Sequence, residues 1–315
     1  MSDFDVICVG IAVVDFPIYP VERSLFDRDV TQIAPPVFYG GGGAINQAIT
    51  LSRLGNKVSL VTMRGNDGFG NILIDIVANA GNNVDVSNVF VDENGSTGFS
   101  AVMIEPNGQR HFCCNRGTNN RFRIMDYLDL AMLKRAKIVS ISALLALPGF
   151  DGADSAFLFS EAKKNGVVTI ADTDVDIKGI GLDGIRETLK NTDYFFPSYT
   201  EAKAITGEEE PEKAARIFLE NGSKHVGIKL GGDGCYFVDA DNEFYMSTFD
   251  GEVVDTTGAG DSFLSGFITG LIHGWDMKTC CRFANAVGTI CVSQVGANTA
   301  VNSFEQINTY LNERI

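Results

Sequence analysis

The sequence predicts an α/β protein with a doubly wound, mostly parallel sheet flanked by helices, plus a small separate β-sheet. First, short runs of β-branched and aromatic residues alternate with longer helical patterns, which is typical of consecutive βαβ units. Second, apolar residues make up 45% of the 315 residues and charged residues 21%, enough to build a large core. Third, two segments, 16–39 and 97–116, break this alternation and predict the small sheet.

The alternation predicts the positions of the strands and helices of the main layers along the chain. Runs such as "KVSLVT" and "VVTIAD" are rich in β-branched residues, and strands are predicted at 5–10, 57–62, 136–142, 167–172, 193–198, 225–230 and 234–239. Apolar residues recurring every three or four positions predict helices at 44–54, 69–80, 152–165, 183–190, 199–206, 211–221, 260–273, 277–294 and 303–313. Because no linker or low-complexity tract interrupts the chain, residues 1–315 are expected to form one domain.

The two segments outside the alternation are expected to pair with each other. Residues 97–116 predict two strands joined at Pro106-Asn107-Gly108, a hairpin turn signal, and residues 16–39 are rich in β-formers and proline. In "FSAVMI" both alternating faces are apolar, whereas a strand open to water on one side normally has a polar face. We therefore expect the second face to be covered by a substrate or by another subunit, and a homodimer through this sheet is one interpretation.

Charge and cysteine content exclude several classes of protein. With 40 acidic and 25 basic residues the net charge is −15, and no Lys/Arg cluster is present, so a nucleic-acid partner is not expected. No apolar run reaches the roughly 18 residues of a membrane span, and the N-terminus lacks the basic region of a signal peptide. Seven cysteines without CxxC spacing are typical of buried free thiols in a reducing compartment, so we expect a cytoplasmic protein.

The stretch "DTTGAGDSF", residues 255–263, combines a glycine loop with a carboxylate at a predicted helix start. The first turn of a helix leaves main-chain N–H groups without partners, and Gly258, Ala259 and Gly260 would let an anion approach them closely. Asp261 lies in the same turn. This pattern predicts phosphoryl transfer, with the amides holding the phosphate and Asp261 accepting the proton of an attacking alcohol. The structural alternative is an acidic residue that only stabilises its own helix.

A second glycine-rich stretch, "GGGGAINQAITLSRLG" at 40–55, also precedes an apolar helix. Its bare backbone, together with the donor and acceptor of Asn46, predicts binding of a polyhydroxy ligand. Asp15 follows the first strand, at the edge where open α/β sheets bind ligands, and could accept bonds from two hydroxyls. Asn115 and Arg116 follow the last strand of the small sheet, where an arginine could clamp a substrate carboxylate or phosphate. Three acids in "DTDVD", 172–176, could bind Mg²⁺ through water, although a solvated loop is the preferred interpretation.

The segments "GGGAINQAITLSRLG" and "DTTGAGDSFLSGFI" resemble the two signature segments of the ribokinase/PfkB carbohydrate kinase family. Both match at every defining position, and the similarity runs from Asp5 to about Val301. The resemblance implies a ribokinase-like fold in which the small sheet is a lid over a sugar. It further implies ATP-dependent phosphorylation of a sugar hydroxyl, with Mg²⁺ as cofactor.

The resemblance also implies roles for individual residues. Asp261 would be the catalytic base, with the anion hole formed by Gly258, Ala259 and Gly260. The sugar would contact Asp15, Gly41, Gly42, Asn46, Asn115 and Arg116. The nucleotide would contact Ser198, Glu201, Lys229, Gly231, Gly234 and Asn285, with Glu201 also reaching Mg²⁺ through water. A monovalent cation, K⁺ in many members, would be bound near Asp255, Thr257, Cys291, Gln294 and Gly296.

The sequence departs from the family pattern at three places. Ser198 stands where the family often has Asn in an Asn-x-x-Glu motif, although Glu201 is kept, so altered phosphate contacts are expected. Val13 replaces an Asn that ribokinase has two residues before the Asp that matches Asp15, and "SISALLALPG" supplies no acid where ribokinase has Glu. These departures favour a sugar or sugar acid other than ribose.

Other functions remain as alternatives. A nucleoside kinase of the same fold would use the same phosphate site, and a sugar-binding sensor would keep the fold without turnover. The retained Asp261 argues against the sensor. The GxGxxG of Rossmann dehydrogenases does not follow the first strand, and GxxxxGK[ST] of P-loop kinases is absent from the sequence.

Overall fold

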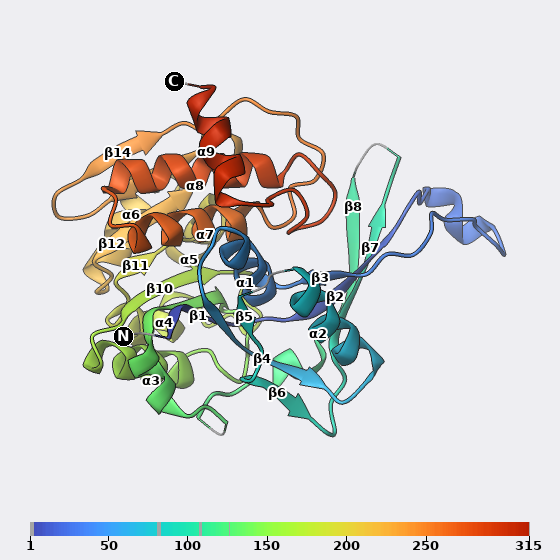
Figure 1. Cartoon of the computed structure of the whole chain (residues 1–315), viewed down its shortest axis with the longest axis horizontal. Coiled ribbons are helices and arrows are strands. Elements are labelled where there is room, and N and C mark those ends of the chain that lie inside the picture. The colour runs from blue at the N-terminus through green and yellow to red at the C-terminus, as the bar shows by residue number, and fades with distance from the viewer. Residues whose placement is uncertain (1–2, 81–82, 107–108, 126, 315) are drawn as a thin grey trace.

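The computed structural model describes residues 3–80, 83–106, 109–125 and 127–314 and contains two sheets (Figure 1). The main sheet has the order β14-β13-β12-β11-β10-β9-β1-β4-β5, with β6 also paired to β4. Strands from β12 to β5 are parallel, whereas β13 and β14 are added antiparallel. The bounds are β1 Phe4–Val9, β4 Val58–Gly65, β5 Val84–Asp85, β6 Val89–Asp92, β9 Ala136–Leu144, β10 Val168–Thr173, β11 Tyr194–Phe195, β12 His225–Lys229, β13 Cys235–Val238 and β14 Glu243–Met246.

Helices cover both faces of this sheet. One face packs against α3 Ala153–Lys164, α4 Gly181–Leu189, α5 Tyr199–Thr206 and α6 Pro211–Glu220. The other packs against α1 Gly43–Arg53, α2 Gly68–Ala80, α7 Ala259–Ile272 and α8 Met277–Cys291, with α9 Phe304–Asn312 outside α8. In β1, Ile7 and Val9 enter the first core while Val6 and Cys8 enter the second, because strand side chains alternate between faces. The doubly wound prediction is confirmed.

The predicted helices are all present, with ends within two residues of the expected positions except for 277–294, which ends at Cys291. The predicted strand 193–198 is wrong at its end: only Tyr194 and Phe195 form β11, since Pro197 has no N–H to donate to a neighbouring strand. The prediction missed β5, β6 and β14. The first two are two and four residues long, and β14 has alternate residues exposed at the edge of the sheet.

The small sheet contains β2 Val13–Ile18, β3 Tyr39–Gly41, β7 Gly98–Ile104 and β8 Arg110–Asn115, in the order β3-β2-β7-β8. The expected pairing between the two irregular segments is confirmed, since β2 pairs parallel with β7 and β7 pairs antiparallel with β8. Of the hairpin turn, Asn107 and Gly108 lie outside the described residues. Residues 19–38 contain no strand. They include the 3₁₀ helix η1, Arg23–Asp27, and project from the sheet at the right of Figure 1.

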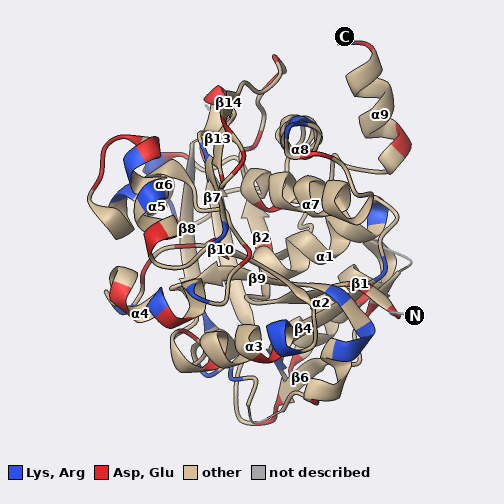
Figure 2. Cartoon of the chain, turned by 90° about the vertical axis from the view of Figure 1, so that its left-hand side faces the viewer, with Lys and Arg blue, Asp and Glu red and all other residues tan. Residues whose placement is uncertain are grey.

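Charged side chains lie mainly on the outer surfaces of the helices and in loops. Lys and Arg are interspersed there with Asp and Glu, while the strands of the main sheet carry few charged residues (Figure 2). None of the helices in the described ranges is long and apolar enough to cross a bilayer.

The aromatic core under α7 depends on Phe196, which follows β11. Phe196 is fully buried, and its ring centroid lies 4.4 Å from that of Phe267 and 5.9 Å from that of Phe263. A Cβ atom on Gly227 of β12 would lie 2.1 Å from the Phe196 ring. Gly227 therefore provides the space that this ring fills.

We expect Phe196→Ala to lower the free energy of unfolding by about 3–5 kcal/mol, because the lost ring leaves a cavity between β12 and α7. The matched control is Phe26→Ala in η1, where the side chain is 89% exposed and the expected change is below about 0.5 kcal/mol. Chemical denaturation of both variants measures the difference, and equal losses would contradict this packing.

Candidate active site

Helix α7 begins in a backbone conformation that only glycine adopts easily. Gly258, the N-cap, has φ 75°, and a Cβ atom there would lie 2.5 Å from the carbonyl oxygen of Ala297. The main-chain N–H of Ala259 donates to the Thr256 carbonyl at 3.3 Å, so Ala259 already has an acceptor within the protein. At Gly260 the place of a side chain is taken by Lys229, whose Nζ lies 3.1 Å from the position of a Cβ atom. The positive end of α7 and an ammonium group therefore meet at Gly260.

Asp261 follows in the same turn and contacts α1. Its Oδ2 accepts a hydrogen bond from Nδ2 of Asn46 at 2.9 Å. Burial raises the pKa of Asp261, while the Asn46 hydrogen bond and the charge of Lys229 oppose that rise. A Cβ atom on Gly43, the first residue of α1, would lie 3.0 Å from Oδ1 of Asp261. The carboxylate therefore lies directly beside the backbone of the glycine run.

Asp15 approaches the same glycine run from the small sheet. A Cβ atom on Gly41 would lie 2.1 Å from Oδ2 of Asp15, so any larger residue at position 41 would displace the carboxylate. Gly42 has φ 85°, and a Cβ there would lie 2.5 Å from the Ile11 carbonyl oxygen. The residues 41–43 thus have one carboxylate at each end, Asp15 and Asp261, although these come from opposite parts of the chain.

The side chain of Lys229 is mostly buried, with 12% of it exposed, and it is paired. It extends from the end of β12, and its Nζ donates to Oδ2 of Asp172 at 2.5 Å. Burial raises the pKa of Asp172 to about 7, against the lowering effect of Lys229. Burial also disfavours the charged form of Lys229, but Asp172 and Glu201 outweigh this and raise its pKa. The preferred interpretation of 172–176 as a solvated loop is wrong for Asp172, which is only 4% exposed.

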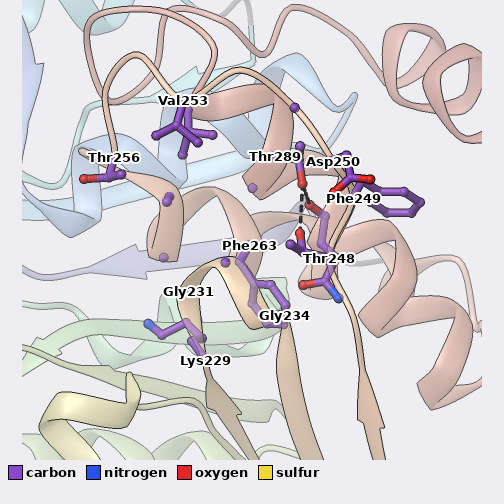
Figure 3. A pocket seen from close by; sticks show the side chains of 17 residues that line it. Lys229, Gly231, Gly234, Thr248, Phe249, Asp250, Val253, Thr256, Phe263 and Thr289 are labelled. Atoms are coloured by element: carbon purple, nitrogen blue, oxygen red, sulfur yellow. Dashed lines mark hydrogen bonds between the residues drawn. The ribbon is translucent and has the colours of Figure 1, made fainter.

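A cavity of about 370 Å³ extends from Lys229 and Gly260 along α7 and α8 (Figure 3). The loop after β12 contributes Gly231 and Gly234, and Phe263 of α7 forms part of the wall (Figure 3). A Cβ atom on Gly234 would lie 2.0 Å from the Met246 carbonyl oxygen, so this loop can pack against the end of β14 only with glycine there. The nucleotide residues implied by the family resemblance at Lys229, Gly231 and Gly234 are thus brought together.

Asn285 of α8 also lines this cavity, but its amide is engaged with the protein. Its Nδ2 donates to the carbonyl oxygens of Met246 and Ser247, both at 3.2 Å. One turn later, the hydroxyls of Thr289 and Thr248 are 2.9 Å apart, as the dashed line in Figure 3 shows. Asn285 therefore fixes the segment after β14 as a wall of the cavity, and its contact with a nucleotide base stays a prediction.

Ser198 and Glu201 form a capping box at the start of α5. Oγ of Ser198 accepts from the Glu201 N–H at 3.3 Å, and Oε2 of Glu201 accepts from the Ser198 N–H at 2.7 Å. The same Oε2 accepts from Oγ1 of Thr173 at 2.9 Å. The serine found at the Asn position of the family motif thus has a structural use, and its contact with phosphate stays a prediction.

Asn46, Asn115 at the end of β8 and Arg116 just after it have partners within the protein. Oδ1 of Asn46 accepts from Nδ2 of Asn298 at 3.1 Å, so both ends of its amide are engaged. Oδ1 of Asn115 accepts from the Gly117 N–H at 2.9 Å. Nη1 of Arg116 donates to the Ala146 carbonyl at 2.6 Å, which joins the small sheet to the loop after β9. Their direct contacts with a substrate stay predictions.

The cation residues implied by the resemblance are largely brought together. The buried Asp255 accepts from the N–H of Thr257 at 2.8 Å through one oxygen and from the N–H of Gly296 at 2.9 Å through the other. Sγ of Cys291 donates to the Thr257 carbonyl at 3.6 Å. Gln294 is exposed in the loop before Gly296. No group of three His, Cys, Asp or Glu side chains suited to a metal occurs in the described part of the chain.

Two buried asparagines that sequence reasoning missed hold the site together. Nδ2 of Asn298 donates to the Gly40 carbonyl at 2.9 Å as well as to Asn46. The amide of Asn119 exchanges two hydrogen bonds with the backbone of Ala12, at 2.8 and 3.1 Å, between β1 and β2. Both residues act on distant backbone, so no local pattern in "GANTAV" or "GTNNRF" could have identified them.

The carboxylate of Asp15 generates a prediction about pH. Burial, and after it the negative charge of Asp255, raises the pKa of Asp15 to about 7. The folded protein therefore keeps a proton that the unfolded chain has already lost, and stability falls as the pH rises from about 4 to about 7. As the pH rises from 5 to 8, the free energy of unfolding of the wild type should fall by at least ~1.4 kcal/mol relative to that of Asp15→Asn.

Urea titrations at several pH values measure this difference. Asp75→Asn on the exposed side of α2 controls for loss of a negative charge, and its difference from the wild type should stay constant. A constant difference for Asp15→Asn would contradict the raised pKa.

The sequence and the fold are similar to those of known proteins. The chain is 28% identical to an uncharacterized sugar kinase of Archaeoglobus fulgidus over 247 residues, covering 78% of this chain and 96% of that one. It is 28% identical to 5-dehydro-2-deoxygluconokinase of Clostridium perfringens over 317 residues, covering 94% and 93%. A solved structure of a candidate ribokinase II of E. coli with ATP and Mg²⁺ matches with a TM-score of 0.85 at 25% identity, covering 98% and 99%. The model of the pfkB family of carbohydrate kinases matches residues 3–303, and the chain therefore belongs to that family.

Proposed function

We propose that this protein transfers the γ-phosphoryl group of ATP to a hydroxyl of a sugar or sugar-derived substrate, with Asp261 as general base. The observation that carries this proposal is the position of Asp261, one residue after the point where the start of α7 meets Lys229. An anion at Gly260 would face the helix N-terminus and the ammonium group, and the neighbouring carboxylate could accept a proton.

The cavity along α7 and α8 would hold the nucleotide, with its phosphates directed towards Lys229 and Gly260. The related E. coli structure with bound ATP and Mg²⁺ supports these as the cofactors. Glu201 is the residue that would reach Mg²⁺ through water, and its carboxylate already lies within the charge field of Lys229. Bound Mg²⁺ would neutralise negative charge on the phosphates. The protein itself would contribute the ammonium group of Lys229 and the start of α7.

The substrate would lie along the glycine run 41–43, between Asp15 and Asp261. Asp15 would accept hydrogen bonds from two hydroxyls, and Asp261 would accept the proton of the hydroxyl that attacks. The new bond joins that oxygen to the γ-phosphorus as the bond from the γ-phosphorus to the β,γ-bridging oxygen breaks, and ADP leaves. Because Asp15 lies on β2, we propose that the small sheet covers the substrate as a lid.

Departures from the ribokinase pattern at the end of β9 and in β2 support a substrate other than ribose. At the end of β9, Ala143, Leu144 and Leu145 are buried apolar residues, and the loop is fixed by Asp151, which accepts from the N–H groups of Leu145 and Leu147 at 2.9 and 2.8 Å. Val13, which is also apolar, lies on β2 two residues before Asp15. A similar chain acts on 5-dehydro-2-deoxygluconate, as its name states, which makes sugar acids and keto-sugars the first compounds to test.

An ADP-release screen tests the function. We expect turnover with at least one pentose, hexose, ketose, sugar acid or phosphosugar in the presence of Mg²⁺ and ATP. Turnover with nucleosides alone would replace this proposal by a nucleoside kinase of the same fold. Binding of a sugar without ADP release would indicate a sensor.

Once a substrate is known, Asp261→Asn should reduce kcat by roughly 10²–10⁴-fold, because only proton acceptance is removed. Substrate binding measured by calorimetry should change little. Asp241→Asn in the exposed turn between β13 and β14 is the control and should leave kcat unchanged. Wild-type turnover in Asp261→Asn would eliminate the general-base role.

We also propose that a monovalent cation binds beside Asp255 and activates the enzyme. A buried carboxylate and neighbouring backbone carbonyls provide the oxygen ligands such cations require. The rate should rise when K⁺ replaces Na⁺ at constant ionic strength, and Asp255→Asn should remove this response. Identical wild-type rates in the two salts would exclude activation by K⁺.

A further inference from the structure

Asn298 lies in the loop between α8 and α9 and is 5% exposed. The two acceptors of its Nδ2 are the carbonyl oxygen of Gly40 at 2.9 Å and Oδ1 of Asn46 at 3.1 Å. Because an amide nitrogen carries two hydrogens, both are used, and the nitrogen must point towards α1. The carbonyl oxygen of Asn298 accepts from the guanidinium of Arg53, which also donates to the Val301 carbonyl at 3.0 Å. Both the backbone and the side chain of Asn298 are thus fixed.

This arrangement decides how the amide of Asn46 is oriented. With Oδ1 accepting from Asn298, the Nδ2 of Asn46 points at Oδ2 of Asp261, 2.9 Å away. In the reversed orientation the NH₂ groups of Asn46 and Asn298 would face each other, and Oδ1 of Asn46 would face a carboxylate oxygen. Both contacts would be repulsive, and Asn46 is only 4% exposed, so water could not easily replace the lost partners.

We propose that Asn298 is a positioning residue for phosphoryl transfer: it holds the amide of Asn46 in the orientation that donates a hydrogen bond to Asp261. The proposal rests on the general-base role of Asp261 given above. A donor stabilises the ionised carboxylate and directs one of its oxygens, which leaves the base ready to accept a proton. Asn298 acts on Asp261 only through Asn46 and is not itself a catalytic residue.

Other charged and titratable groups act on Asp261 from the elements packed around it. Lys229 at the end of β12 favours the ionised form, whereas Asp172 in β10 and Asp174 just after it disfavour it. Cys8 of β1 and Cys291 of α8 are thiols whose own pKa values are raised by burial and by Asp261. Among the described residues, Asn298 has hydrogen bonds to Gly40, Asn46 and Arg53 and to none of these groups, so substitution of Asn298 can be tested apart from them.

The experiment measures the acid limb of the pH profile of kcat/KM in Asn298→Ala, Asn46→Ala and the double variant. Loss of Asn298 frees the Asn46 amide to rotate, so we expect Asn298→Ala to move the acid limb to higher pH. Activity should fall several-fold more at pH 6 than at pH 8.5. In the Asn46→Ala background the same substitution should cause no further shift, because the intermediary is gone.

A second variant keeps the size of the side chain. Asn298→Asp replaces the donor by an acceptor, so Asn46 would turn its NH₂ towards the introduced carboxylate and its oxygen towards Asp261, and the acid limb should move further than in Asn298→Ala. The matched control is Asn302→Asp in the same loop, whose amide donates to the Ala300 carbonyl and not to Asn46. Its acid limb should match the wild type.

The outcomes separate this inference from the proposed function. Wild-type acid limbs in folded Asn298→Ala and Asn298→Asp, in an active enzyme, would overturn the positioning role while leaving the kinase proposal intact. If the wild type phosphorylates no sugar, the proposed function fails. In that case the pH dependence of the free energy of unfolding tests the inference. Asn298→Asp should change this pH dependence more when residue 261 is Asp than in the Asp261→Asn background.

Discussion

The hydrogen bond between Asn46 and Asp261 joins two residues 215 positions apart and fixes where the helices α1 and α7 meet. Each helix has a glycine N-cap at the carboxyl edge of the parallel strands, next to the point where the strand order reverses. Because a side chain on Gly43 would come within 3.0 Å of Asp261, the two helix starts can approach only through bare backbone. The glycine run and the carboxylate of Asp261 meet at this contact, and Asp15 of the small sheet approaches the same run.

Opposite charges are held close together at the same edge. Lys229 is paired with Asp172 and is further influenced by Glu201 and Asp261, so its ammonium lies among acids. A phosphate approaching Gly260 would have to share Lys229 with Asp172, which weakens anion binding but keeps the buried ammonium compensated when no anion is bound. This charge balance would allow the proposed site to bind phosphate and then release it.

Two residues that the sequence analysis assigned to ligand contacts have hydrogen-bond partners within the protein. Ser198 departs from the family motif, yet with Glu201 it forms a capping box that satisfies the start of α5. Asn46 has both a donor and an acceptor, but the acceptor is taken by Asn298 and one donor by Asp261. For both residues the sequence predicted a contact with a ligand, and that contact stays a prediction. Within the protein, Ser198 has its partner three residues away at Glu201, whereas the partners of Asn46 lie far along the chain.

Periodicity and glycine placement in the sequence were sufficient to predict the layers, the helix ends and the two helix starts that carry Asp261 and Asn46, because these depend on local backbone preferences and on alternation of apolar residues. Short or edge strands such as β5 and β14 escaped prediction since pairing with a neighbour, not composition, forms them. Only the tertiary structure decided that Asp172 is buried against Lys229 and that Asn298 reaches Asn46. Both contacts join segments with no shared pattern, so they exist only once the sheet and its helices are packed.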